Sequence, residues 1–416
     1  MDKPLAIIIA CDNASTHFGG EAILPYHYFR LLLERHIDVH LVVHARCREE
    51  LCQKFPQALN RLHFIEDNRF ELYLYQLGLN PRLKLLSPFT EFLRLMIFYI
   101  KQRQAVQKLI KTGSFTLIHQ PIPVSPKQPS YLFNLGVPLI IGPMNGGMIF
   151  PPGMPPIYSF FSRFHTQVGR FLAHILNFII PGKRQAKLLL AANKRTQEAL
   201  PFWMSSPVKI LVENGVDLNV WKAPVQVLRK EDTPVRFVYL GRLIELKGVD
   251  YLVSAFAKVK SVVPDAELHF LGDGPLMEPL KKKAQELGCA QSTYLHGFVD
   301  WWQCEEELKR NHVMVFPSLA ECGGAAVLEG MASGLPVIAT DWGGPKDYLD
   351  TSCGILVAPL NAELFEKGLA DAMIRLAKDP QLCYAMGQAG RAKVVQQFDW
   401  NKKVDQILDY YRMYAE

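Results

Sequence analysis

The sequence lacks the features that mark several large classes of protein. None of its eight cysteines forms a Cys-x-x-Cys pair, so neither zinc ligation nor a disulfide framework is indicated, and free thiols suit a reducing compartment. It contains no run of about 18 uncharged apolar residues, so no transmembrane helix is predicted. The net charge is +6 without a long Lys/Arg run, which argues against nucleic acid as a partner.

The 416 residues suffice for two domains, and the 49% apolar content indicates a folded chain. The first apolar run, Leu5–Ala10, is too short for the core of a signal peptide and has the length of a buried strand. Strands alternate with helical patterns along most of the chain. The pattern predicts an α/β fold with parallel sheets in two domains, residues 1–205 and 206–398.

The first half is expected to open a doubly wound domain. Its first strand runs into a glycine turn at Gly19-Gly20, and a later strand, Phe115–Gln120, carries His119 near its end. A lone strand-end histidine is more often structural than catalytic. Residues 187–201 are interpreted as a helix, and the helix at 399–416 is expected to pack back on this domain.

Two stretches of the first half, residues 88–111 and 157–187, mix aromatic and aliphatic residues with Lys and Arg. Both fit ordinary amphipathic helices whose apolar faces pack on the core. The alternative is that one or both lie at a membrane interface, with basic groups near anionic lipid. The sequence leaves both interpretations open.

In the second half, four successive strands each end in residues suited to an anionic ligand. These are Gly241-Arg242 with Lys247, then Gly272-Asp273-Gly274, then His296-Gly297, and finally Glu321 before Gly323-Gly324. Ligands of a parallel sheet bind at the carboxyl ends of its strands. Two cations and a helix N-terminus at one edge would neutralise a diphosphate.

Residues 312–347 form the central stretch of this half, a strand, glycine turn, helix and strand. Glu321 precedes the helix and Glu329 lies about one turn inside it. Carboxylates do not help phosphate to bind, so the pattern indicates a ligand with hydroxyls as well as phosphates. A sugar nucleotide has both.

The second half resembles the retaining glycosyltransferases of family 4, which have the GT-B fold of two Rossmann-like domains whose parallel sheets face each other across a cleft. The resemblance covers nearly all of residues 207–400. It rests on ENGVD (213–217), GR…KG (241–248), LGDGP (271–275), HGFV (296–299), PSLAECGGAAVLEGMA (317–332), GLPVIATDWGG (334–344) and FDW (398–400). In the first half the match is looser.

The resemblance implies roles for individual residues. Arg242 and Lys247 would bind the donor diphosphate, Glu321 the hydroxyls of the sugar and Glu329 the ribose, while His119 would contact the sugar near its anomeric centre. His119, Glu321, Arg242 and Lys247 are the implied catalytic residues. The implied donor-binding residues are Gly19, Gly20, Asn214, Gly241, Arg242, Lys247, Gly272, Gly274, His296, Gly297, Phe298, Val299, Glu321, Cys322, Gly323, Gly324, Ala325 and Glu329.

Three positions depart from the family pattern. Gly323 replaces a residue that is often bulky, so a wider or differently shaped sugar pocket is expected. Gly330 replaces the usual alanine and weakens its helix by about 1 kcal/mol. Asp347 replaces a commoner glutamate.

The expected activity is transfer of a sugar from a nucleotide-sugar donor to an acceptor hydroxyl, with retention and without a metal or cofactor. The expected acceptor is a glycan or lipid-linked molecule, in glycolipid, lipid-linked glycan or cell-surface polysaccharide synthesis. A cytoplasmic location is expected, with peripheral contact to an anionic membrane as an option. The alternatives are a sugar-nucleotide epimerase, a phosphorylase-like enzyme, or a non-catalytic sugar- or lipid-binding protein.

Overall fold

The computed structural model describes residues 4–18, 20–80, 83, 87–155, 169, 172–222, 228–229 and 233–415. These residues form two compact units. The N-terminal unit takes its residues from Met1–Gly147, Phe164–Glu213 and Val404–Glu416, and the C-terminal unit from Met148–Arg163 and Asn214–Lys403. The chain thus passes between units after Glu213, eight residues beyond the predicted boundary. Gly19 lies outside the described residues.

The N-terminal unit is built on a seven-stranded parallel sheet with the order β3-β2-β1-β4-β5-β6-β7. Its strands are β1 (Ala6–Ala10), β2 (Asp38–His44), β3 (Leu62–Ile65), β4 (Leu117–Gln120), β5 (Leu139–Met144), β6 (Leu188–Ala191) and β7 (Val208–Ile210). Ile7, Ile8 and Ile9 are fully buried, because a central parallel strand is covered on both faces.

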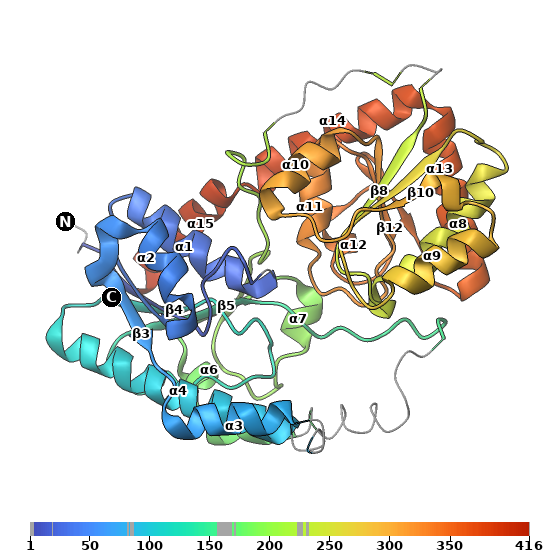
Figure 1. The fold of residues 1–416 in the computed structure, drawn as a ribbon. Helices are drawn as coiled ribbons and strands as arrows, with labels where there is room; N and C mark the ends of the chain where they lie inside the picture. The colour runs from blue at the N-terminus through green and yellow to red at the C-terminus, as the bar shows by residue number, and fades with distance from the viewer. Residues whose placement is uncertain are drawn as a thin grey trace. The chain divides into compact units, whose positions relative to one another are not determined.

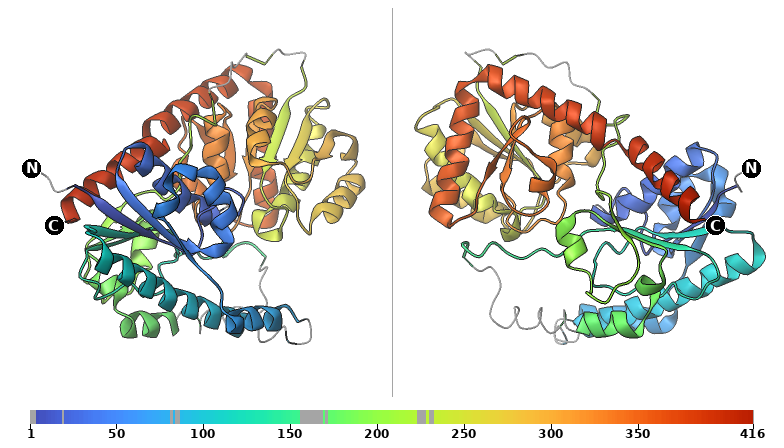
Figure 2. Two further views of the ribbon diagram at one scale, coloured as in Figure 1. Left: turned by 60° about the vertical axis from the view of Figure 1, so that its left-hand side comes forward. Right: turned by 180° about the vertical axis from the view of Figure 1, so that it is seen from behind.

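Helices cover both faces of this sheet (Figure 1). They are α1 (Ile23–Glu34), α2 (Arg48–Lys54), α3 (Arg69–Leu79), α4 (Ser87–Thr112), α6 (Gly182–Gln185) and α7 (Lys194–Glu198). α4 contributes Phe98, Tyr99 and Val106 to a core cluster with Ile8 and Ile118. α3 packs alongside α4 on the same side, as both views in Figure 2 show.

One sequence interpretation of this unit was wrong. Residues 187–201 were expected to form a helix, but Leu188–Ala191 is the buried strand β6, and only the five residues of α7 that follow are helical. Leucine and alanine are good helix formers, and a short apolar run cannot be assigned to strand or helix by its periodicity. Pairing with β5 and β7 decides its conformation here.

The C-terminal unit has a six-stranded parallel sheet with the order β10-β9-β8-β11-β12-β13. Its strands are β8 (Arg236–Leu240), β9 (Glu267–Leu271), β10 (Thr293–Leu295), β11 (Val313–Phe316), β12 (Val337–Thr340) and β13 (Gly354–Val357). The order reverses between β8 and β11, and a ligand site is expected at such a switch point. The prediction of an α/β chain with two parallel sheets is confirmed.

Helices again cover both faces, with α8, α9 and α13 on one side and α10, α11 and α14 on the other (Figure 1). They are α8 (Val249–Lys260), α9 (Met277–Glu286), α10 (Trp301–Lys309), α11 (Ala325–Ala332), α12 (Pro345–Tyr348), α13 (Ala362–Lys378) and α14 (Pro380–Gln397). Among the helices that the structure describes, none combines the length and hydrophobicity needed to cross a membrane.

The last helix, α15 (Trp400–Tyr414), begins in the C-terminal unit and ends in the N-terminal unit. Its apolar face, formed by Val404, Ile407, Leu408 and Tyr411, is buried. Arg35 of the N-terminal unit donates to Asp405 at 2.9 Å, which fixes this helix on that unit.

Candidate functional site

The loops after β8 and β9 are joined along their backbones. The amide of Gly241 donates to Leu271 O at 3.0 Å, and the amide of Leu243 donates to Asp273 O at 2.9 Å. A side chain at Gly272, where φ is +150°, would place its Cβ 1.9 Å from the carbonyl oxygen of Gly241. This glycine therefore lets two strand-end loops lie against each other, and the guanidinium-bearing Arg242 is exposed at their edge.

The loop after β8 is also tied to the loop after β11. The amide of Leu319 donates to Leu246 O at 2.9 Å, and a Cβ at Gly248 would lie 2.3 Å from Pro317 O. This contact brings two predicted site residues together. The ammonium of Lys247, in one loop, forms an ion pair with the carboxylate of Glu321, in the other. The two side chains are 16% and 18% exposed, so the pair is largely shielded from solvent.

Two aromatic residues that sequence analysis missed support this pair. The ring of Phe316, the last residue of β11, lies 5.4 Å from Nζ of Lys247, within cation–π range. The hydroxyl of Tyr239 donates to Arg242 O at 2.9 Å. Burial, and next the charge of Glu321, raises the pKa of Tyr239, so the phenol stays protonated and remains a donor. In the sequence, only their positions near the ends of β11 and β8 indicated that Phe316 and Tyr239 belong to the site.

The loop from Glu321 to Gly324 leads into α11. Gly324 adopts φ +91°, a left-handed conformation that favours glycine, and α11 begins directly after it. The carbonyl of Glu321 accepts from the amide of Gly344, at 2.8 Å, so the loop after β12 braces this turn. The predicted residues Cys322, Gly323 and Ala325 therefore lie at a helix N-terminus beside the Lys247–Glu321 pair. Unbonded N–H groups at a helix start favour anions.

Glu329 lies on α11, partly exposed. Burial, and next the charge of Glu329, raises the pKa of Cys304 on α10 to about 12. The departure from the family at Gly330 has a local cause. A Cβ there would lie 2.3 Å from Sδ of Met314, a fully buried residue of β11, so glycine allows α11 to approach the sheet.

The remaining predicted donor-binding residues of this unit, apart from Asn214, lie in the loops after β9 and β10. The amide of Gly272 donates to Gly297 O at 2.8 Å, so the residues after β10 adjoin the loop after β9. His296 lies 3.1 Å from a ring nitrogen of His269, and Phe298 is 77% exposed. Val299 is partly buried, and Gly274 meets the backbone of the Gly241 loop. Asn214 donates to the hydroxyl of Tyr348 on α12, at 3.0 Å.

His119 occupies a different setting, in the core of the N-terminal unit. It is fully buried, with Nε2 2.6 Å from Gly142 O and Nδ1 2.6 Å from the hydroxyl of Tyr411. A carbonyl only accepts, so Nε2 carries the proton and Nδ1 accepts from Tyr411. Burial lowers the pKa of His119 to about 4. This position favours the structural role and puts the ring in contact with α15; the expected contact with a donor sugar stays a prediction. Gly20 starts a short turn in open space.

The edge of the C-terminal sheet thus combines an exposed guanidinium, a shielded ammonium–carboxylate pair and a helix N-terminus. Arg and Lys bind phosphate, and a carboxylate accepts from sugar hydroxyls. Within the described residues, no three His, Cys, Asp or Glu side chains gather as a metal site would require.

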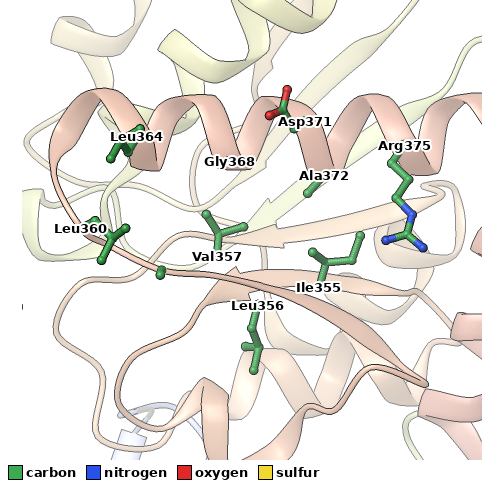
Figure 3. A pocket seen from close by; sticks show the side chains of 10 residues that line it. Ile355, Leu356, Val357, Leu360, Leu364, Gly368, Asp371, Ala372 and Arg375 are labelled. Carbon is green, nitrogen blue, oxygen red and sulfur yellow. The ribbon is translucent and has the colours of Figure 1, made fainter.

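A hollow of about 460 Å³ elsewhere in this unit lacks these groups. It lies between β13 and α13, where Figure 3 shows Val357 and Ile355 beneath the helix and Asp371 and Arg375 as its charged residues. None of the predicted site residues is among those that line it. The strand-end loops, not this hollow, are therefore the candidate site.

Known proteins match the same part of the chain. Residues 223–393 match the model of the family "Glycosyl transferases group 1". An alpha-maltose-1-phosphate synthase of Mycolicibacterium smegmatis is 30% identical over 49% of this chain and 56% of its own length. A GDP-mannose-dependent phosphatidylinositol monomannoside mannosyltransferase of the same organism is 32% identical over 41% and 46%. The chain spans about half the length of these relatives.

Solved structures match both units. The Anabaena protein HepE, solved with UDP, has a TM-score of 0.66 at 16% identity over 98% of this chain and 100% of its own. A sucrose-phosphate synthase from Thermosynechococcus elongatus has a TM-score of 0.64 at 20% identity, over 99% and 98%. At these identities the likeness shows the fold. Residues 223–393 thus match the glycosyl transferases group 1 family in sequence, and both units share the GT-B fold of these solved structures.

Proposed function

We propose that this protein transfers a sugar from a nucleotide-sugar donor to an acceptor hydroxyl, with the anomeric configuration retained. One observation carries the proposal: Arg242, the Lys247–Glu321 pair and the N-terminus of α11 meet at the switch point of the C-terminal sheet. The matched family segment contains every one of these groups.

The residues divide the work according to their charge. Arg242 and Lys247 bind the diphosphate and stabilise the charge that grows on it as the bond to the anomeric carbon breaks. Glu321 holds sugar hydroxyls, and Glu329 holds the ribose. The acceptor oxygen bonds to the anomeric carbon on the face that the phosphate leaves, and the acceptor's proton passes to that phosphate. Positioning and charge stabilisation are the protein's contribution.

Phe316 and Tyr239 tune this arrangement without contacting the donor. The Phe316 ring confines the Lys247 ammonium, and Tyr239 fixes the backbone at Arg242. The ion pair keeps both charged groups compensated until a ligand enters. Phosphate then competes for Lys247 while a hydroxyl donates to Glu321, so binding exchanges one charge-assisted contact for two.

The names of the relatives support the donor class: one is GDP-mannose-dependent, and HepE was solved with UDP. For the acceptor we propose a lipid-linked glycan or glycolipid, with cell-surface polysaccharide as the alternative, because one of these relatives acts on a phosphatidylinositol monomannoside. A cytoplasmic location is proposed because all eight cysteines have free thiols.

A thermal-shift screen with UDP, GDP, ADP and their sugars tests the donor half. One nucleoside diphosphate should raise the melting temperature, whereas Arg242→Ala combined with Lys247→Ala should abolish the shift. Proton NMR of the product made from the selected donor should show the donor's own anomeric configuration. Inversion, release of an epimer, or binding without turnover on any glycosyl acceptor would overturn the proposal.

A further inference from the structure

The N-terminal unit contains an apolar cavity that the donor chemistry does not use. Its volume is about 770 Å³, within the range of small-molecule sites. Three segments distant in sequence form its walls: α4, the loop after β4, and the helical residues around 172–176. The lining residues are Pro88, Phe89, Glu91, Phe92, Leu95, Met96, Tyr99, Lys127, Gln128, Pro129, Tyr131, Gly169, Leu172, Ala173, Ile175 and Leu176.

The loop wall of this cavity is held by polar contacts from α4. Gln128 donates to the hydroxyl of Tyr99 at 2.9 Å. Arg103 donates to Tyr131 O at 2.9 Å, and its guanidinium lies 4.1 Å from the ring centroid of Phe133. The loop is thus fixed along the helix rather than collapsed into the space beside it.

A second set of contacts holds the same loop from the other side. Asn177 donates to Lys127 O at 2.6 Å. The ammonium of Lys183, which is only 2% exposed, donates to Ser125 O at 3.1 Å and Pro126 O at 2.7 Å. Burial lowers the pKa of Lys183 to about 7. Two backbone carbonyls compensate the burial of this amine, so the contact holds the loop that forms one wall of the cavity.

The lining decides the chemistry of the occupant. Sugars need many hydrogen-bond partners, but this wall is mostly aliphatic and aromatic. Its charged side chains are Lys127 and Glu91, and Glu91 accepts from Arg94 at 3.1 Å. Burial of a hydrocarbon chain is favourable in such a space.

The surface beside the helical residues 172–176 indicates the source of such a hydrocarbon chain. Leu172 and Ile175 line the cavity and are 51% and 40% exposed, while Phe178 and Ile179, one turn later, are 59% and 67% exposed. Trp203 stacks on Phe178, with ring centroids 6.5 Å apart.

Aromatic and basic groups meet on this surface. Phe202 is 98% exposed and stacks on Trp203, and the guanidinium of Arg184 lies 5.7 Å from the Phe178 ring. Exposed aromatics beside basic side chains are typical of surfaces that contact anionic membranes. The cavity therefore adjoins a surface suited to a lipid bilayer.

We propose that the cavity binds the hydrocarbon chain of a phosphate-linked lipid acceptor, a prenyl or acyl chain drawn from the membrane. The proposal rests on the glycosyltransferase function and identifies its acceptor. The segment that forms one wall of the cavity also carries the exposed side chains of Phe178 and Ile179, so one element serves both membrane contact and chain binding.

Binding of prenyl phosphates tests this without requiring sugar transfer. Geranylgeranyl phosphate and isopentenyl phosphate have the same headgroup but differ in chain length. Calorimetry should show at least tenfold tighter binding of the longer compound. Ala173→Phe, which fills the cavity, should remove this difference, and Leu172→Lys, at a half-exposed position, should weaken binding of the longer compound at least tenfold. Ala385→Phe, at an exposed position of α14, is the matched control and should change nothing.

The outcomes separate this proposal from the donor function. The thermal shift by the nucleoside diphosphate should persist in all three variants, which also shows that they fold. Equal affinity for the two phosphates, or unchanged binding in both Ala173→Phe and Leu172→Lys, overturns the chain site even if donor binding is intact. Loss of donor binding in wild type instead contradicts the proposed function.

Discussion

The two sheets have the same construction but differ at their switch points. In the C-terminal unit, the switch between β8 and β11 exposes glycine loops, Arg242 and the Lys247–Glu321 pair. In the N-terminal unit, the switch between β1 and β4 carries His119, bonded within the core to Tyr411 and Gly142. The first arrangement presents charge to a ligand, and the second fixes the last helix. The C-terminal unit therefore offers a polar site at its strand ends. In the N-terminal unit, the site that we propose is apolar and lies between helices and a loop.

Removal of the Glu321 carboxylate tests the polar site of the C-terminal unit, where the largest effect is expected. Glu321→Ala should lower turnover by about 10³-fold, because it deletes a contact to the sugar and releases Lys247 from its partner. The measurement is kcat with the donor selected in the thermal-shift screen. Glu278→Ala, on an exposed carboxylate of α9, should retain activity. An unchanged kcat would remove Glu321 from the mechanism.

The cations of the same site should affect affinity. Arg242→Ala with Lys247→Ala should weaken donor binding about 100-fold or more, since hydrogen bonds to charged groups are worth about 1.5–3 kcal/mol each. Calorimetry with the selected nucleoside diphosphate measures this. Lys258→Ala with Arg310→Ala removes the same charge from surface ion pairs and should leave affinity intact. Similar weakening in both double variants would mean that overall charge, not the site, binds the donor.

His119 tests the other side of the comparison through pH. Its folded pKa of about 4 lies below the ordinary 6.5, so between these values the unfolded chain binds a proton that the folded chain does not. The stabilisation is therefore complete above pH 6.5 and is lost as the pH falls towards 4, by about 3 kcal/mol in total. Urea denaturation of His119→Gln should show a correspondingly smaller loss of stability over this range.

His17→Gln is the control, because the His17 side chain is 72% exposed and lies outside the core. A wild-type pH dependence in His119→Gln would contradict the buried, neutral ring. The kinetic readout addresses the role implied by the family resemblance. A large fall in kcat at pH 7.5, with stability unchanged, would place His119 at the donor sugar after all.

The sequence predicted the C-terminal site because its motifs are local. Each cluster lies within a few residues of a strand end, and parallel strands bring those ends to one edge. It did not predict the pairing of Lys247 with Glu321, which depends on contacts between loops 74 residues apart. The cavity of the N-terminal unit could not be predicted at all, since its walls combine α4, residues 127–131, Gly169 and residues 172–176. The helix assigned to 187–201 failed because only strand pairing distinguishes Leu188–Ala191 from a helix.

The smallest effect is expected at Gly330. Its substitution tests why α11, whose N-terminus forms part of the candidate site, lies so close to the sheet. Gly330→Ala should lower the free energy of unfolding by about 1 kcal/mol. Alanine gains about 1 kcal/mol in helix propensity, but its Cβ would meet Met314 Sδ, and overpacking typically costs about 1–3 kcal/mol. Urea denaturation with and without Met314→Ala forms a double-mutant cycle that isolates the contact.

Gly390→Ala is the matched control for this cycle. Gly390 is also a buried helical glycine, on α14, but a Cβ there would lie 3.5 Å from its nearest neighbour, an ordinary contact. This substitution should therefore stabilise the protein by up to about 1 kcal/mol. In the Met314→Ala background, Gly330→Ala should become stabilising too, because the obstructing sulfur is gone. If it remains destabilising there, Met314 does not explain the departure from the family's alanine, and the approach of α11 to β11 is fixed by another contact.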